Sequence, residues 1–212
     1  MLMTTNDKKT HWQNVYNEKK PEETSWFQEF PMGSLDYIQK AMSELSEPPS
    51  VIDVGSGASQ LLDSLVAIGI KRITALDIAA GGLRASKARL GELGENIKWV
   101  VSDVTQWHPD KQYDLWHDRA VYHFLTRDED RQKYMKTLKA ATRRGSFVII
   151  SGFAIDGPIE CSGLPVRRLT PAILDKDMGP AFERLAESKE THITPWGAEQ
   201  SFQYCLYERV ER

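Results

Sequence analysis

The chain has 212 residues, of which 41% are hydrophobic and 27% are charged, and its mean hydropathy is -0.46. This composition is typical of a folded globular protein and argues against a disordered, collagen-like or membrane-embedded chain. The net charge of -3 gives no general attraction for phosphate backbones, so we do not expect a nucleic-acid partner.

Targeting and redox features favour the cytoplasm. No apolar run approaches the roughly 20 residues that a membrane helix requires, and the N-terminal segment lacks the apolar core of a signal peptide. The two cysteines, Cys161 and Cys205, are too few for a disulfide framework, and no Cys or His spacing typical of a zinc site occurs. We therefore expect a cytoplasmic protein with no membrane partner and no metal site.

The first fifty residues differ in character from the rest. Residues 11–30 are aromatic and charged without a sustained period, whereas residues 34–45 place apolar side chains on one helical face. Two consecutive prolines then end that helix. We predict that residues 1–49 form a helical lid on a single domain that spans residues 1–212, with residues 50–212 as its main body.

Short apolar runs rich in β-branched residues come next, and each predicts a strand. These runs cover residues 51–54, 72–76, 97–101, 113–116 and 146–150. Stretches with helical periodicity lie between most of them, as parallel βαβ units require. These stretches cover residues 61–67, 79–90 and 127–141.

The C-terminal third changes pattern again. Residues 151–169 form a long loop punctuated by Gly and Pro, and a helix begins at Thr170. Residues 186–194 and 200–209 then predict an antiparallel hairpin. We therefore predict an α/β fold with a doubly wound, mostly parallel seven-stranded sheet that ends in this hairpin.

The sharpest local signal is a buried strand that runs into Gly55 and Gly57 and then into a helix. Glycines at such a turn let a ligand approach the peptide groups in front of a helix N-terminus. A tight strand–helix turn without any ligand is the plain alternative. A dinucleotide-binding dehydrogenase would need a third glycine at position 60, where this chain has Gln60.

An acidic residue also stands at the end of each of the first three strands. Asp53 lies two residues before the first glycine, Asp77 ends the second strand, and Asp103 follows the third. In nucleotide-binding folds the ligand occupies the crevice at the carboxyl ends of the strands, where an acid can accept the hydroxyl protons of a ribose. Asp53 would suit a ligand that carries an ammonium group rather than a pyrophosphate.

The segment from Asp53 to Ser59, together with Asp77, Asp103 and the strand at 113–117, resembles the class I S-adenosylmethionine-dependent methyltransferases. The resemblance implies a Rossmann-like sheet with strand order 3-2-1-4-5-7-6 and S-adenosylmethionine as the cofactor, with S-adenosylhomocysteine as its product. Ser59 departs from the pattern, since many members have a third glycine there.

Residue by residue, the resemblance implies a cofactor site. Asp53 would stabilise the methionine ammonium, and Gly55 and Gly57 would face the methionine and the ribose. Asp77 would bind the ribose hydroxyls and Asp103 the adenine amino group. The remaining residues that it implies for the cofactor are Ser59, Ile78, Val104 and His117.

The loop after the fourth strand lies beside the transferred methyl group in this family. Here that strand ends in His117, Asp118 and Arg119. If a general base is used, His117 or Asp118 is the first candidate, followed by Tyr122 and His123. The plain alternatives are ordinary hydrogen-bonded histidines and a local Asp118–Arg119 ion pair. The loop is similar to that of lysine methyltransferases acting on elongation factor or citrate synthase, which read Asp-Lys-Gly.

The N-terminal segment is similar to the lid of those lysine methyltransferases and, more loosely, to that of thiol and halide methyltransferases. Arg167 and Arg168 lie in the loop after the fifth strand, where they would either clamp an anionic substrate by charge-assisted hydrogen bonds or be solvated. We expect the loop at 151–169 on the substrate side of the crevice. The predicted substrate residues are Trp26, Arg119, Tyr122, His123, Arg167 and Arg168.

The resemblance thus implies an enzyme that transfers the methyl group of S-adenosylmethionine to a small metabolite, and the arginines favour an anionic one. Two alternatives remain open at this point. One is a protein-lysine N-methyltransferase. The other is a partner protein that binds S-adenosylmethionine without catalysing a reaction.

Overall fold

The computed structural model describes residues 4–211, and its strands build one large sheet and one small ladder. The large sheet consists of β1 (Ser50–Val54), β2 (Arg72–Asp77), β3 (Lys98–Val101), β4 (Leu115–Arg119), β5 (Phe147–Phe153), β8 (Phe182–Ile193) and β9 (Glu199–Arg209). The ladder pairs β6 (Glu160–Cys161) with β7 (Leu164–Pro165) inside the predicted loop.

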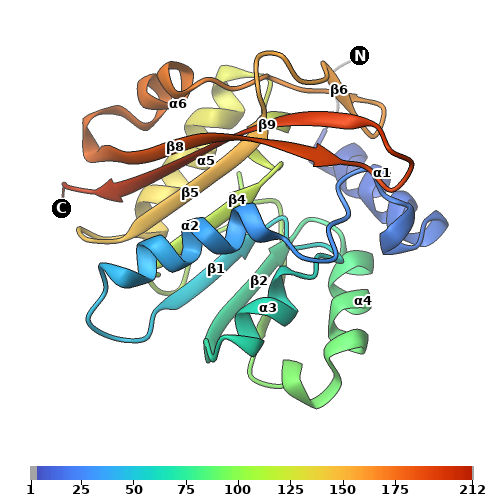
Figure 1. Cartoon of the computed structure of the whole chain (residues 1–212), viewed down its shortest axis with the longest axis horizontal. Helices are drawn as coiled ribbons and strands as arrows, with labels where there is room; N and C mark the ends of the chain where they lie inside the picture. Colours follow the sequence, from blue (N-terminus) through green and yellow to red (C-terminus); the bar gives the residue numbers. More distant parts are fainter. Residues whose placement is uncertain (1–3, 212) are drawn as a thin grey trace.

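The strand order of the large sheet is β3-β2-β1-β4-β5-β9-β8. Strands β1 to β5 are parallel to one another, whereas β9 is antiparallel to β5 and to β8 (Figure 1). Counted within this sheet alone, the order is 3-2-1-4-5-7-6, which confirms the predicted fold. The register of β1 and β4 sets Asp53 beside His117.

Helices cover both faces of the sheet. They are α1 (Thr5–Glu18), α2 (Met32–Ser43), α3 (Leu61–Ala67), α4 (Ala80–Leu90), α5 (Asp128–Ala141) and α6 (Pro171–Met178). Helices α2, α3 and α4 pack on one face, and α5 and α6 pack on the other. Within residues 4–211, none of the helices combines the length and the apolar character that crossing a bilayer requires.

The central strands are buried on both faces, which explains why they read as continuous apolar runs. Successive side chains alternate between the two faces. In β1, Val51 packs in the cluster beneath α2 and α3, and Ile52 packs in the cluster beneath α5. In β4, Leu115 likewise packs in the cluster beneath α2 and α3, and Trp116 packs in the cluster beneath α5. This alternation also determines which polar residues at the ends of these strands face the crevice.

Helix α1 and strand β4 differ from the sequence-based expectation. Helix α1 covers Thr5–Glu18, entirely outside the helical face predicted at 34–45, because only its Val15 is buried and no apolar period marks it. It is stabilised at its start by a capping box between Thr4 and Asp7. Strand β4 covers Leu115–Arg119 rather than the apolar run at 113–116, so His117, Asp118 and Arg119 belong to the strand and alternate between the two faces of the sheet.

Candidate active site

Two adjoining hollows open at the carboxyl edge of the parallel strands. The larger encloses about 930 Å³ and the smaller about 600 Å³, open mouths included, which is the size range of small-molecule sites. The larger lies over the ends of β1, β2 and β3 and extends to β5 and β9, and the smaller lies between the glycine turn and the start of α2. They share four lining residues, which are Tyr16, Trp26, Gly55 and Arg119.

The turn between β1 and α3 forms the floor where the hollows meet. Gly55 and Gly57 have φ values of +71° and +50°, a region that favours glycine. The amide nitrogens of Gly55 and Ser56 donate to the carbonyl oxygen of Leu76 at 2.7 and 3.0 Å, which fastens the turn to β2. A Cβ atom on Gly57 would lie 2.2 Å from the hydroxyl oxygen of Tyr16, so that hydroxyl stands directly over the turn.

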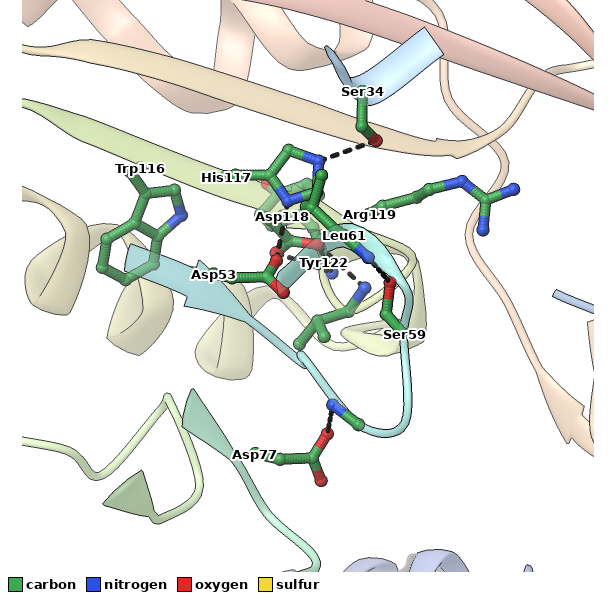
Figure 2. Close-up of polar contacts among 12 residues, drawn as sticks. Ser34, Asp53, Ser59, Leu61, Asp77, Trp116, His117, Asp118, Arg119 and Tyr122 are labelled. Atoms are coloured by element: carbon green, nitrogen blue, oxygen red, sulfur yellow. Dashed lines mark hydrogen bonds and ion pairs between the residues drawn. The ribbon is translucent and has the colours of Figure 1, made fainter. Parts of the chain in front are cut away.

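Asp77 connects this turn to the end of β2. Its Oδ2 accepts a hydrogen bond from the amide of Gly57 at 2.9 Å (Figure 2). Its Oδ1 accepts one from the amide of Ala79 at 2.8 Å. Burial raises the pKa of Asp77 to about 7, although both amide hydrogen bonds act to lower it. The carboxyl therefore changes charge near neutral pH.

Asp53 and His117 form a buried pair in the smaller hollow. The Oδ1 atom of Asp53 lies 2.7 Å from Nδ1 of His117, and Nε2 of His117 lies 2.9 Å from Oγ of Ser34 on α2 (Figure 2). The other carboxylate oxygen, Oδ2 of Asp53, is buried and has no hydrogen-bond partner within residues 4–211. A buried carboxylate oxygen without a partner is costly, so a bound cation or donor would stabilise it.

Arg119 lies where the two hollows join, at the end of β4. Its Nε donates to the hydroxyl of Tyr204 at 3.1 Å, and its Nη1 donates to the carbonyl oxygen of Trp26 at 3.3 Å. The guanidinium carbon lies 4.2 Å from the centre of the Phe202 ring, within the range of a cation–π contact. The remaining nitrogen, Nη2, is buried without a hydrogen-bond partner in the described part of the chain.

Helix α1 covers the crevice. Its Thr5 hydroxyl donates to Oδ2 of Asp103 at 2.9 Å, and its Lys8 pairs with Asp130 on α5 at 3.2 Å. The Tyr16 hydroxyl is buried, and its pKa is raised well above the usual value by burial and by the charges of Asp77 and Asp53. Figure 1 shows α1 beyond the carboxyl ends of the strands, next to α4.

An aromatic cluster lines the half of the larger hollow that reaches β5 and β9. Its members are Trp12, Trp26, Phe124, Phe153 and Phe202. Trp12 meets Trp26 and Phe124 edge-on, with ring centres 5.7 and 5.1 Å apart. Beside the cluster, burial raises the pKa of the Cys161 thiol to about 11, which keeps the thiol protonated at neutral pH.

The structure brings most of the predicted site residues to this crevice. Those that line one of the two hollows are Trp26, Asp53, Gly55, Ser59, Asp77, Ile78, Asp103, Val104, His117 and Arg119. Gly57 lies beneath the Tyr16 hydroxyl. The residues that the resemblance assigns to the cofactor therefore gather at one edge of the sheet.

Besides Gly57, five predicted residues do not line either hollow. Asp118 is fully buried on the opposite face of β4, where it accepts hydrogen bonds from the amide of Val121 at 2.8 Å and the Tyr134 hydroxyl at 2.6 Å. The Tyr122 hydroxyl donates to Asp177 at 2.7 Å, and Arg167 pairs with the same carboxylate. The contacts with Asp177 tie Tyr122 and Arg167 to α6, and the contacts of Asp118 keep its carboxylate away from the crevice.

The other two are His123 and Arg168. His123 is fully buried, edge-on to Phe124 with ring centres 4.3 Å apart, and its Nδ1 accepts from the amide of Phe153 at 3.3 Å. Burial and the charge of Arg119 lower the pKa of His123 to about 3, so it is neutral. Arg168 donates to the carbonyl oxygen of Gly157 at 3.4 Å.

Sequence patterns did not identify Ser34 and Tyr204 as site residues. Ser34 lies in the first turn of α2, and its contacts with His117 and Tyr204 join residues far apart in the chain. Tyr204 occupies an inward position of the alternating strand β9, which predicts a core residue. The only signal available for Tyr204 was a hydroxyl at a core position, because such a group usually needs a partner.

A family model described as a methyltransferase domain matches residues 51–145. The malonyl-[acyl-carrier protein] O-methyltransferase of Anoxybacillus flavithermus is 28% identical over 163 residues, covering 75% of this chain and 61% of that protein. The EEF1A lysine methyltransferase 2 of Danio rerio is 26% identical over 133 residues, covering 59% of this chain and 57% of that protein. The chain thus spans less than two thirds of the length of either relative.

Solved structures share the fold at low identity. A SAM-dependent methyltransferase from Anabaena variabilis superposes with a TM-score of 0.73 at 12% identity, covering 99% of this chain and 96% of that one. This likeness shows that nearly the whole chain, including the C-terminal hairpin, shares the fold of that protein. Residues 51–145 therefore match a methyltransferase domain, and the chain as a whole has the fold seen in an S-adenosylmethionine-dependent methyltransferase of known structure.

Proposed function

We propose that this protein transfers the methyl group of S-adenosylmethionine to a small-molecule acceptor. One observation carries the proposal. The carboxylates of Asp53, Asp77 and Asp103 face one crevice from the ends of three neighbouring parallel strands, and Asp53 keeps a buried oxygen without a partner in the described part of the chain. S-adenosylmethionine has one donor group for each carboxylate, namely its ammonium, its ribose hydroxyls and its adenine amino group.

The roles of the chain's own residues follow from this arrangement. Asp77 accepts the ribose hydroxyls with the oxygens that now bind the Gly57 and Ala79 amides. Asp103 accepts from the adenine amino group, and Ile78 and Val104 line the adenine on either side. The Tyr16 side chain has to turn away from the glycine turn when the cofactor enters.

The bound cofactor supplies an electrophilic methyl group on a sulfonium centre. The protein's task is to hold an acceptor atom in line with that methyl group, and positioning of this kind lowers a barrier by up to about 7–11 kcal/mol. Neither predicted base is free to act. His117 is held between Asp53 and Ser34, and Asp118 is turned to the opposite face of β4. We therefore propose an acceptor that requires no early loss of a proton to a side chain.

The aromatic cluster supports a small acceptor with an apolar or aromatic body, enclosed beneath α1. The expectation of an anionic acceptor depended on three arginines. Arg167 and Arg168 lie outside the crevice and bind Asp177 and a backbone carbonyl. Of the three, only Arg119 is able to meet an anion in the crevice.

Calorimetry with S-adenosylhomocysteine tests cofactor binding. We expect a Kd in the micromolar range or tighter, no comparable binding of NAD, and an affinity weakened by about 1–3 kcal/mol in Asp77→Ala, since a charge-assisted contact is lost. Arg168→Met is the matched control and should bind like the wild type. Absence of binding to the wild type would contradict the proposal.

Methyl transfer itself is tested by incubating the protein with S-adenosylmethionine labelled in its methyl group and with a cell extract divided into small molecules and proteins. Label in the small-molecule fraction is expected. Label on lysine residues in the protein fraction would instead support the protein-lysine alternative. Cofactor binding without transfer to either fraction would identify a non-catalytic binding protein.

A further inference from the structure

Two charged side chains in the crevice, one acidic and one basic, each have a buried polar atom without a partner. One is Oδ2 of Asp53 and the other is Nη2 of Arg119, with no hydrogen-bond partner for either within residues 4–211. Both residues line the smaller hollow, on the glycine-turn side of the crevice. Leaving a buried charged group unsatisfied is costly, so the pair favours one ligand that presents a cation and an anion together.

A chain of hydrogen bonds joins the two residues. Nε of Arg119 donates to the Tyr204 hydroxyl at 3.1 Å, and that hydroxyl lies 3.4 Å from Oγ of Ser34. Oγ of Ser34 lies 2.9 Å from Nε2 of His117, whose Nδ1 lies 2.7 Å from Oδ1 of Asp53 (Figure 2).

The bonds of this chain have one consistent direction. An arginine nitrogen only donates and a carboxylate only accepts. With the proton of His117 on Nδ1, Tyr204 donates to Ser34, and Ser34 donates to His117. Each intermediate group therefore donates once and accepts once, and the atoms left over are Nη2 at the cationic end and Oδ2 at the anionic end.

We infer that Arg119 binds the α-carboxylate of the cofactor's methionine moiety while Asp53 binds its α-ammonium. The inference rests on the proposed function and assigns Arg119 to the cofactor rather than to the acceptor. An α-amino acid carries both charges on one carbon atom, which matches two opposite groups in one small hollow. Arg119 is the only Lys or Arg residue among the described residues that line this hollow.

The other groups in this chain of hydrogen bonds position the side chains of Arg119 and Asp53. Tyr204 and the Trp26 carbonyl hold two of the three guanidinium nitrogens, so Nη2 is the one free to bind an anion. His117 occupies Oδ1 of Asp53 and leaves Oδ2 for the ammonium. Ser34, Tyr204 and His117 are thus positioning residues, and the site should distinguish ligands by the charges on the amino-acid end.

Calorimetry with three ligands tests this inference. S-adenosylhomocysteine carries both charges, its decarboxylated amine analogue carries only the ammonium, and 5′-methylthioadenosine carries neither. We expect Arg119→Met to weaken S-adenosylhomocysteine at least tenfold, since a charge-assisted hydrogen bond is lost, and to leave the affinities of the other two ligands unchanged. Tyr204→Phe should produce a smaller loss that is also confined to S-adenosylhomocysteine.

The controls separate the possible outcomes. Arg119→Lys keeps a cation and should recover part of the affinity, which also serves if Arg119→Met fails to fold. Unchanged S-adenosylhomocysteine binding in a folded Arg119→Met protein would overturn the inference and return Arg119 to the acceptor. An equal loss for all three ligands would also overturn it, because it would indicate general damage. Failure of the wild type to bind S-adenosylhomocysteine would overturn the proposed function instead.

Discussion

Oδ2 of Asp77 lies 2.9 Å from the amide nitrogen of Gly57 and accepts its hydrogen bond, which joins the end of β2 to the turn that follows β1. The same carboxylate caps the Ala79 amide at the start of α4. One buried side chain therefore fixes three segments of the crevice, and its charge affects both the fold and the ligand site.

Substitution of Asp77 by asparagine should have a pH-dependent effect on stability. In the folded protein the pKa of Asp77 is raised to about 7, above its ordinary value of 3.8. The contribution of the Asp77 carboxyl to the free energy of unfolding is therefore fully present below pH 3.8 and is lost as the pH rises through about 7. The asparagine side chain of the variant has no charge to gain or lose. The destabilisation caused by Asp77→Asn should shrink by about 2–3 kcal/mol between about pH 5 and pH 8.

Denaturant unfolding of wild type and variant at both pH values measures this difference. The comparison cancels other titrating groups, such as His123, whose lowered pKa acts in the opposite direction. A difference in unfolding free energy that does not change with pH would show that Asp77 keeps an ordinary pKa in the folded protein.

Gly82 should be intolerant of alanine. A Cβ atom there would lie 2.7 Å from Cα and 2.8 Å from the carbonyl carbon of Gly57, both backbone atoms of the glycine turn. Alanine normally stabilises a helix interior by about 1 kcal/mol relative to glycine. Here we expect Gly82→Ala to destabilise the protein by about 1–3 kcal/mol, because overpacking displaces the turn, and to weaken S-adenosylhomocysteine binding.

Gly81→Ala is the matched comparison in the same helix. A Cβ atom there would meet side-chain atoms of Gln13 and Tyr16 on α1, at 2.7 and 2.9 Å, and no backbone atom of the turn. Gly81→Ala should displace α1 and cause a smaller loss of stability than Gly82→Ala. Equal effects of the two substitutions in thermal unfolding and calorimetry would show that contact with the turn is not what excludes a side chain at Gly82.

Tyr122 should prove structural rather than substrate-binding. Its hydroxyl donates to Asp177 at 2.7 Å, and a hydrogen bond to a charged group contributes about 1.5–3 kcal/mol. Tyr122→Phe should lower the free energy of unfolding by an amount near this range, without changing the Kd of S-adenosylhomocysteine or the KM of an acceptor. A raised KM with unchanged stability would restore Tyr122 to the substrate site.

The sequence was informative wherever topology brings residues together. The acids Asp77 and Asp103 could be assigned to one crevice because the carboxyl ends of parallel strands meet at one edge of the sheet. The residues at the end of the fourth strand could not be assigned in this way. They were expected at the crevice together, whereas successive side chains of β4 alternate between the two faces, so that Asp118 is directed away from the crevice.

Side-chain contacts between residues far apart in the sequence could not be predicted. Ser34 and Tyr204 come from α2 and β9, and their contact with each other leaves no local pattern in the chain. The bounds of helix α1 could not be predicted for a different reason. The helix is mostly polar, and its contacts with the crevice come from Thr5, Lys8, Trp12 and Tyr16, whose spacing does not form an apolar face.

Thr5 should compete with the cofactor for Asp103. The Thr5 hydroxyl donates to Oδ2 of Asp103 at 2.9 Å, while Oδ1 accepts from the amide and hydroxyl of Thr105. We expect the adenine amino group to take the place of the Thr5 hydroxyl at Oδ2. Thr5→Val leaves that oxygen free, so S-adenosylhomocysteine should bind about 3–10-fold more tightly, since the ligand-free protein no longer has this hydrogen bond to lose.

Thr5→Ser keeps the hydroxyl and should bind like the wild type, which separates the loss of the hydrogen bond from the change in side-chain shape. Calorimetry at one pH and salt concentration gives the three affinities. Weaker binding by Thr5→Val would show that Thr5 stays on Asp103 in the complex. In that case α1 would form part of the adenine site, and the cofactor would bind without breaking the hydrogen bond between Thr5 and Asp103.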